Sequence, residues 1–244
     1  MRTSIAPKRS SRWPNDHGPS RVRTDNLSIP FWSPAEVEAG LRPALAQIEA
    51  RRVLAYPTET VYGFGGGADR DSVDALVALK SRPPGKPFLL LVAGPDMVER
   101  LNLRLPSYAS NLIARHWPGP LTLVLLGGDK RVPDRLRGPE GGVAVRWTPN
   151  PMISRLIRAH GDAITSTSAN RPGVPPATSA GEILEQWSDA VARGTLRVLD
   201  GGRLVESKPS TVLDCTGRAP RVIRPGAITA ATLRESVPNL IGDA

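Results

Sequence analysis

Three cationic side chains, Lys80, Arg82 and Lys86, lie close together in a segment that reads Lys-Ser-Arg-Pro-Pro-Gly-Lys-Pro. Proline fixes the backbone φ angle, so this segment has few conformations to choose from. A lysine ammonium acts as a point charge, and an arginine guanidinium offers a planar fork to two oxygens. A stiff loop that carries both is typical of a polyphosphate site, although a solvated charged turn is the simpler explanation of this loop taken alone.

Hydroxyl and amide side chains recur in other segments. Ser166, Ser168 and Asn170 alternate along Ser-Thr-Ser-Ala-Asn, so in an extended segment they would face the same side; a capped turn before Arg-Pro-Gly is the alternative. Thr60 lies in Tyr-Pro-Thr-Glu-Thr-Val-Tyr-Gly, before a glycine cluster, and an ordinary strand position explains it nearly as well. Arg146 closes a Val-Ala-Val-Arg segment at an expected strand end, where a surface salt bridge is the alternative role.

The sequence offers little to other catalytic chemistries. The histidines, His17, His116 and His160, have no His or Cys partner at ligand spacing, so we expect no zinc site and identify no protein ligands for another metal. P-loop and Gly-x-Ser-x-Gly patterns are also missing from the sequence. The single cysteine, Cys215, excludes an internal disulfide and fits a reducing cytoplasm. The remaining cations, hydroxyls and amides suit nucleotidyl transfer by positioning and charge neutralisation.

The composition indicates a folded protein that attracts anions. With 244 residues and 40% hydrophobic content, the chain can bury a full core. No apolar run approaches the roughly 18 residues that a transmembrane helix needs, so no membrane association is expected. The formal net charge of +9 attracts polyanions. Because this charge is spread along the chain and aromatic residues make up only 5%, it supports weak RNA binding at most.

Hydrophobic periodicity predicts which elements position these residues. A helix begins at Ser33-Pro-Ala-Glu, with a Ser cap, Pro at the first helical position and Glu at the third, and it continues to about residue 48. Further helices are expected at 71–80, 106–116, 151–160 and 178–192. Strands are expected at 53–56, 88–93, 121–126, 143–147, 163–167, 196–199, 210–214 and 221–224. Because they mix without strict βαβ repetition, the predicted class is α/β: a single domain with a mixed, twisted open sheet and flanking helices.

The chain is expected to divide into three segments. Residues 1–32 are rich in Pro, Ser and Arg and show no apolar periodicity, which predicts a disordered basic N-terminal arm. Residues 33–236 contain no linker-like stretch and are expected to form the catalytic domain. Residues 237–244 are left as a C-terminal tail.

The order of the motifs resembles one family. Tyr-Pro-Thr-Glu-Thr-Val-Tyr-Gly, Lys-x-Arg-Pro, Trp-Pro-Gly-Pro-Leu-Thr, Val-Arg, Ser-x-Asn, Ser-Thr-Val and Arg-Pro-Gly follow one another as in the YrdC family of threonylcarbamoyl-AMP synthases. The resemblance covers roughly residues 34–236 and implies a YrdC-like fold. It also implies that L-threonine, bicarbonate or CO2, and ATP with Mg2+ give threonylcarbamoyl-AMP and pyrophosphate. The product would serve threonylcarbamoyladenosine modification of tRNA next to the anticodon, in the cytoplasm.

The resemblance also implies roles for individual residues. The cationic loop would hold the triphosphate and the leaving pyrophosphate, and the Ser-x-Asn motif would bind phosphate oxygens or the carboxylated amine. The residues expected to be catalytic are Lys80, Arg82, Ser168 and Asn170. The residues expected to bind ATP or L-threonine are Thr60, Lys86, Arg146, Ser166, Ser210 and Arg224, of which Thr60 and Arg146 would contact threonine. The Trp-Pro-Gly-Pro-Leu-Thr motif is expected to be mainly structural.

The sequence departs from the family pattern in places. Many relatives have a threonine-contacting His at the position of Leu91, and a Thr or Ser where Gly141 and Gly142 stand. The chain resembles the short type of the family, which relies on tRNA-modifying transferase partners. The alternatives are a nucleotide-binding paralogue without synthase activity, an RNA-binding module, and a carbamoyl transferase module of a larger enzyme. The last is disfavoured because the zinc-finger and acylphosphatase segments expected in that context are missing from this sequence.

Overall fold

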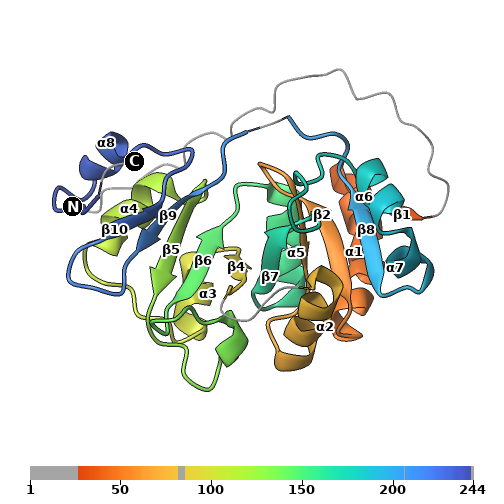
Figure 1. Ribbon diagram of the computed structural model, residues 1–244, viewed down its shortest axis with the longest axis horizontal. Coiled ribbons are helices and arrows are strands. Elements are labelled where there is room, and N and C mark those ends of the chain that lie inside the picture. The colour runs from red at the N-terminus through yellow and green to blue at the C-terminus, as the bar shows by residue number, and fades with distance from the viewer. Residues whose placement is uncertain (1–26, 82–85, 206, 243–244) are drawn as a thin grey trace, which may run out of the picture.

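A ten-stranded sheet organises the part of the chain that the computed structural model describes, residues 27–81, 86–205, 207–242. The strand order is β1-β8-β2-β3-β7-β4-β6-β5-β9-β10, which puts β7 near the middle and β1 and β10 at opposite ends (Figure 1). The strands are β1 (Ser28–Pro30), β2 (Val53–Pro57), β3 (Tyr62–Gly65), β4 (Leu89–Val92), β5 (Leu121–Leu125), β6 (Val143–Trp147), β7 (Ile164–Ser168), β8 (Leu196–Asp200), β9 (Thr211–Asp214) and β10 (Arg221–Arg224).

The sheet is mixed, as the sequence predicted. Parallel pairs, such as β4 with β6 and β5 with β9, stand beside antiparallel pairs, such as β3 with β7 and β5 with β6. The helices are α1 (Pro34–Glu49), α2 (Arg70–Lys80), α3 (Pro95–Arg100), α4 (Ala109–His116), α5 (Pro151–His160), α6 (Ala180–Gln186), α7 (Ser188–Ala192) and α8 (Ala230–Arg234), with a 3-10 turn η1 (Asp134–Leu136). The prediction of a single mixed α/β domain with flanking helices is confirmed.

Local sequence signals fix the starts of two helices, α1 and α5. Ser33 and Glu36 form a capping box at the start of α1, with Pro34 at the first helical position, as predicted. Asn150 caps α5 by accepting hydrogen bonds from the backbone N–H groups of Met152 and Ile153. These caps satisfy N–H groups that have no partner inside the helix, so both helices begin at defined residues.

The core lies between the sheet and its helices. Strand β2 is buried along its whole length because it lies between β8 and β3 and is covered by α1. Tyr56 of β2 is fully buried, and its phenol donates a hydrogen bond of 2.7 Å to the carbonyl oxygen of Thr165 in β7. Burial raises the pKa of Tyr56 above its ordinary value, so this phenol keeps the proton that it donates.

The predicted boundaries need correction at both ends of the domain. Residues 28–30 were assigned to the arm, but they form β1, which pairs in parallel with β8, and Phe31 is fully buried behind them. Residues 237–242 were assigned to a tail, but Val237 and Leu240 are buried and Ile241 forms a bridge with Arg221. Both segments are too short to show periodicity, and partners distant in sequence hold them. The rest of the arm, residues 1–26, and residues 243–244 lie outside the described residues.

Other elements also differ from the prediction. The helix expected at 178–192 is two helices, α6 and α7, which meet at Trp187. Helix α3 and strand β3 were not predicted; β3 reads Tyr-Gly-Phe-Gly, and glycine weakens any strand pattern. Among the described residues, no helix is long and apolar enough to cross a membrane.

Candidate functional site

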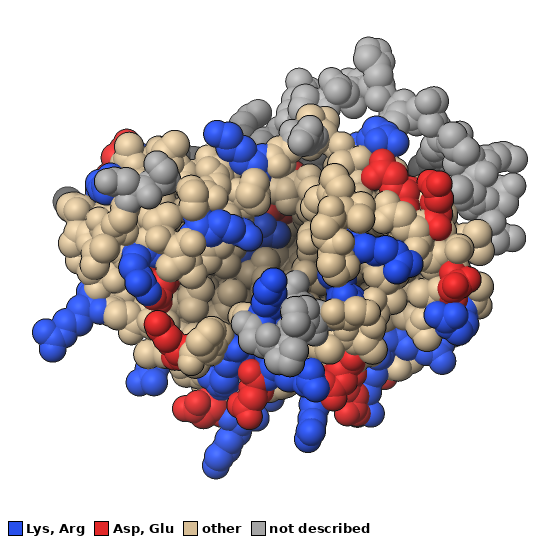
Figure 2. Space-filling model, viewed as in Figure 1, with Lys and Arg blue, Asp and Glu red and all other residues tan. Residues whose placement is uncertain are grey.

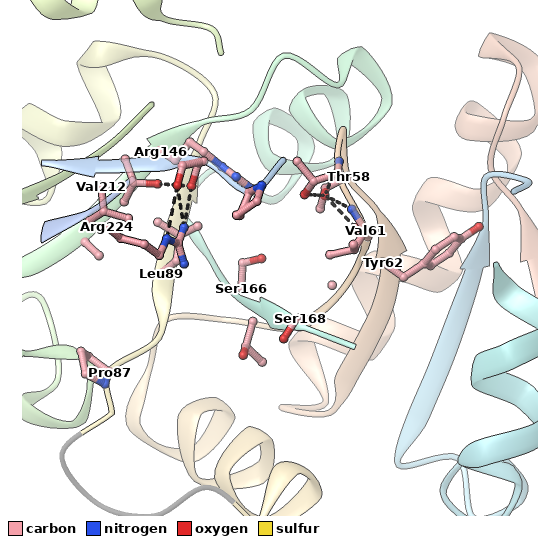
Figure 3. Close-up of a pocket in the computed structure, with 17 residues that line it drawn as sticks. Thr58, Val61, Tyr62, Pro87, Leu89, Arg146, Ser166, Ser168, Val212 and Arg224 are labelled. Atoms are coloured by element: carbon pink, nitrogen blue, oxygen red, sulfur yellow. Dashed lines mark hydrogen bonds between the residues drawn. The ribbon is translucent and has the colours of Figure 1, made fainter. Parts of the chain in front are cut away.

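A pocket of about 270 Å³ opens on one face of the sheet, across the strands from β3 to β10 (Figure 3). Figure 2 shows a hollow in the middle of the molecule's face, with Lys and Arg side chains around it. The pocket is lined by Thr58, Thr60, Val61, Tyr62, Gly63, Pro87, Leu89, Thr122, Ala144, Arg146, Ser166, Thr167, Ser168, Pro209, Ser210, Val212 and Arg224. We call this feature the groove.

Strand geometry explains why these residues share one face. Successive side chains of a strand point to opposite faces, so residues two apart line the same side. Ala144 and Arg146 of β6 show this spacing, and so do Ser166 and Ser168 of β7. The strands that carry the groove are consecutive in the sheet order, β3-β7-β4-β6-β5-β9-β10. The sheet therefore brings together polar side chains that lie far apart in the sequence.

Arg146 and Arg224 lie on the same side of the groove and give it a positive charge (Figure 3). Arg146 is only 5% exposed, and its Nη1 lies 3.0 Å from Oε1 of Glu59. The guanidinium of Arg224 donates hydrogen bonds to the carbonyl oxygen of Ser210 at 2.8 Å and to its Oγ at 3.0 Å. Burial, with the nearby positive charge of Arg146, lowers the pKa of Arg224 from its ordinary value. Two guanidinium groups on one side of the groove favour the binding of an anion there.

The end of β7 is tied to the last residue of α2. The ammonium of Lys80 donates hydrogen bonds to the carbonyl oxygen of Ser168 at 3.0 Å, to Oδ1 of Asn170 at 2.9 Å and to the carbonyl oxygen of Asn170. Ser168 Oγ donates to the same Oδ1 at 2.6 Å. An ammonium has three N–H donors, so this cluster can use all of them. Lys80 thus holds the Ser-x-Asn segment in place beside the groove.

The turn between β2 and β3 supplies hydroxyl groups on the opposite side of the groove. Thr58 Oγ1 donates to the carbonyl oxygen of Val61 at 2.7 Å and lies 3.2 Å from Oγ1 of Thr60. Both threonines are buried at the residue level. These contacts hold the Thr58 hydroxyl in place and bring the Thr60 hydroxyl beside it.

Most of the sequence-predicted residues meet in this groove. It contains Thr60, Arg146, Ser166, Ser168, Ser210 and Arg224. Lys80 and Asn170 lie behind it, in hydrogen-bonding contact with Ser168. Lys86 is exposed and directly precedes Pro87, which lines the groove. Arg82 lies outside the described residues, so its predicted role stays a prediction.

The sequence did not reveal several residues in or beside the groove. Thr122 belongs to a motif that was interpreted as mainly structural, yet it lines the groove, and its Oγ1 lies 2.9 Å from Oγ of Ser210. Its alternation with Leu121 and Leu123 in a strand was the signal that could have identified it. Glu59 lies between two threonines and was not among the predicted site residues. Only its long-range contact with Arg146 identifies it as part of the site. Leu91 lies opposite Arg146 in the β4–β6 register and is fully buried, whereas Leu89 of the same strand lines the groove.

Known proteins resemble this chain in both sequence and fold. A family model, Sua5_yciO_yrdC, described as "Telomere recombination", matches residues 46–226. The threonylcarbamoyl-AMP synthase of Bacillus subtilis (strain 168) is 34% identical over 82% of this chain and 56% of its own length. That of Marinobacter nauticus is 35% identical over 71% of this chain and 91% of its own length. The crystal structure of Pyrococcus abyssi Sua5 complexed with L-threonine superposes with a TM-score of 0.76 at 33% identity, covering 84% of this chain and 59% of that one.

The fold and the groove define a mixed α/β protein whose sheet carries a positively charged, hydroxyl-rich binding site. The chain belongs to the Sua5/YciO/YrdC family. It spans 56% of the Bacillus subtilis relative and 59% of the Pyrococcus abyssi structure.

Proposed function

We propose that this protein is an L-threonylcarbamoyladenylate synthase, a nucleotidyltransferase that makes threonylcarbamoyl-AMP and pyrophosphate from L-threonine, bicarbonate or CO2, and ATP. One observation carries the proposal: two guanidinium groups, a row of hydroxyls and a lysine-held Ser-x-Asn segment converge on one groove. The names of the curated relatives and the threonine bound to Pyrococcus abyssi Sua5 support the same reaction.

The side with Arg146 is the proposed threonine site. Its buried guanidinium would hold the α-carboxylate, because such a group recognises two carboxylate oxygens at once. Nε of Arg146 is buried and has no hydrogen-bond partner among the described residues, so it has a donor to offer. The hydroxyl of Thr60, across the groove, would contact the rest of the amino acid.

The reaction then needs positioning more than acid–base chemistry. The threonine nitrogen adds to CO2, with loss of a proton, to give an N-carboxylate. An oxygen of that carboxylate attacks the α-phosphorus of ATP, the bond from this phosphorus to the bridging oxygen breaks, and pyrophosphate leaves with the electron pair. The reactants are two anions, so neutralising their charge and holding them in line supplies much of the catalysis.

The charges around β7 would take the phosphate part of this reaction. Ser166, Ser168 and Ser210 offer hydroxyls to phosphate oxygens, and Arg224 adds a positive charge. Lys80, with Arg82 and Lys86 after it, would neutralise the triphosphate, and Asn170 would position Ser168. We propose that Mg2+ arrives with ATP as part of the substrate, held by phosphate oxygens and water.

The biological setting is proposed on the same basis. The product is a reactive mixed anhydride, so a second protein must accept it; tRNA-modifying transferase partners would pass its threonylcarbamoyl group to adenosine next to the anticodon. ATP, threonine and tRNA meet in the cytoplasm, where we place the protein. Weak RNA binding by the positive surface would be compatible with this role.

Pyrophosphate release from ATP tests the proposal. We expect release that requires both L-threonine and bicarbonate and that falls at least about tenfold in Arg146→Ala, from loss of a charge-assisted contact. The matched control is Arg155→Ala, an exposed arginine paired with Glu38 on the surface, which should keep full activity. ATP binding without threonine-dependent release would overturn the proposal in favour of a nucleotide-binding paralogue. RNA binding without ATP turnover would favour an RNA-binding module.

A further inference from the structure

The carboxylate of Glu59 lies beside the proposed threonine site and has no role in the reaction as described above. Its side chain is 15% exposed, and its buried Oε1 forms an ion pair with Nη1 of Arg146 at 3.0 Å, without the geometry of a hydrogen bond. The buried guanidinium therefore has a fixed negative partner on one side. Its Nε is buried and has no hydrogen-bond partner among the described residues.

Glu59 is itself held by the start of helix α5. Thr148 Oγ1 donates a hydrogen bond of 3.1 Å to Oε2 of Glu59 and accepts one of 3.2 Å from the backbone N–H of Asn150, the α5 cap. The side-chain amide of Asn150 donates to the carbonyl oxygen of Pro57 at 3.3 Å. Each carboxylate oxygen of Glu59 thus has its own neighbour, Arg146 on one side and Thr148 on the other. Such a carboxylate cannot rotate without losing a contact.

We propose that Glu59 is a positioning residue, which holds the Arg146 guanidinium so that its unpartnered Nε edge meets the α-carboxylate of the amino-acid substrate. This inference rests on the proposed function and adds a residue that the function did not require. An arginine side chain has many rotamers, and a contact that restricts them before binding lowers the entropy lost on binding.

Kinetics of Glu59 variants test the proposal. We expect Glu59→Ala to raise the threonine KM about tenfold to a hundredfold, and to leave the ATP KM within about twofold. Glu59→Gln keeps an oxygen for Arg146 and a hydrogen-bonding group for Thr148, so it should restore the threonine KM to within about threefold of wild type. Glu38→Ala, which removes the exposed carboxylate paired with Arg155, is the matched control and should leave both KM values unchanged. A Glu59→Ala variant with an unchanged threonine KM, or with both KM values raised equally, would overturn the proposal.

A second measurement needs no turnover. In a 15N-arginine NMR spectrum, the Arg146 side-chain signals are those lost in Arg146→Lys. The proposal expects slow exchange between the Nη groups of Arg146 in wild type and Glu59→Gln, and fast exchange in Glu59→Ala. Slow exchange in all three would overturn it. If the wild type shows no threonine-dependent turnover, the proposed function fails, but these spectra still decide whether Glu59 holds Arg146.

Discussion

The buried ammonium of Lys80 gives a prediction that separates its structural role from its expected role at the phosphates. Lys80→Met keeps most of the side-chain stem and removes the ammonium, so the carbonyl oxygens of Ser168 and Asn170 and the Asn170 side chain lose a charged donor. Hydrogen bonds to charged groups contribute about 1.5–3 kcal/mol each, and the three share one group, so they are not additive. We expect the free energy of unfolding to fall by about 3–5 kcal/mol.

Urea denaturation followed by tryptophan fluorescence measures this change. With a slope of about 2 kcal/mol per molar urea, the midpoint should fall by about 2 M, and the melting temperature by about 10 °C. Lys208→Met is the matched control: Lys208 is exposed, and its replacement should change the free energy of unfolding by less than about 0.5 kcal/mol. Equal midpoints for the two variants would refute the conclusion that Lys80 holds the Ser-x-Asn segment.

Two further predictions follow from close packing and from burial. A Cβ on Gly65 would lie 1.7 Å from the carbonyl oxygen of Thr165, so Gly65→Ala should cost at least about 3 kcal/mol of unfolding free energy. A Cβ on Gly181 would meet only Ser179 Oγ, at 4.0 Å, so Gly181→Ala should cost nothing. Similar urea midpoints for both variants would contradict this. Burial and a neighbouring arginine lower the pKa of His116 in the folded protein. The unfolded chain therefore binds a proton at this histidine more readily than the folded protein does. As a result, the stability present above the ordinary pKa of histidine is lost as the pH falls below that value. The melting temperature should therefore fall less from about pH 7 to about pH 5 in His116→Gln than in wild type. An equal fall in both proteins would contradict the assignment.

Local signals explain which parts of the fold were predictable. The Ser33 cap and the apolar spacing of α5 are visible within a few residues of sequence, and those helices begin where they were expected. Strand β1 has only three residues, and it forms by pairing in parallel with β8, which lies far along the chain. No periodicity can show a pairing of that kind.

The same distinction applies to the site. Arg146 was predicted to bind a carboxylate because it is an arginine, and Ser166 and Ser168 were predicted to bind substrate because they carry hydroxyls. The spacing of the two serines also predicted that they share one face of a strand. Their partners were out of reach, because Glu59 meets Arg146 only after β2, β3 and β6 have assembled into one sheet. The contact of Lys80 with Asn170 likewise joins the end of α2 to the end of β7. The residue types predicted a phosphate-binding lysine but could not show its hydrogen bonds within the protein.

Isotope tracing of the nucleotide product tests the central claim most directly. The purified chain would be incubated with MgATP, 13C-bicarbonate and 15N-threonine, and its nucleotides would be analysed by mass spectrometry. The account predicts a new AMP conjugate that carries both labels, forms together with pyrophosphate and is missing when any one substrate is left out. Conversion of ATP to unlabelled ADP or AMP alone, or no conversion by a folded protein that binds threonine, would contradict it.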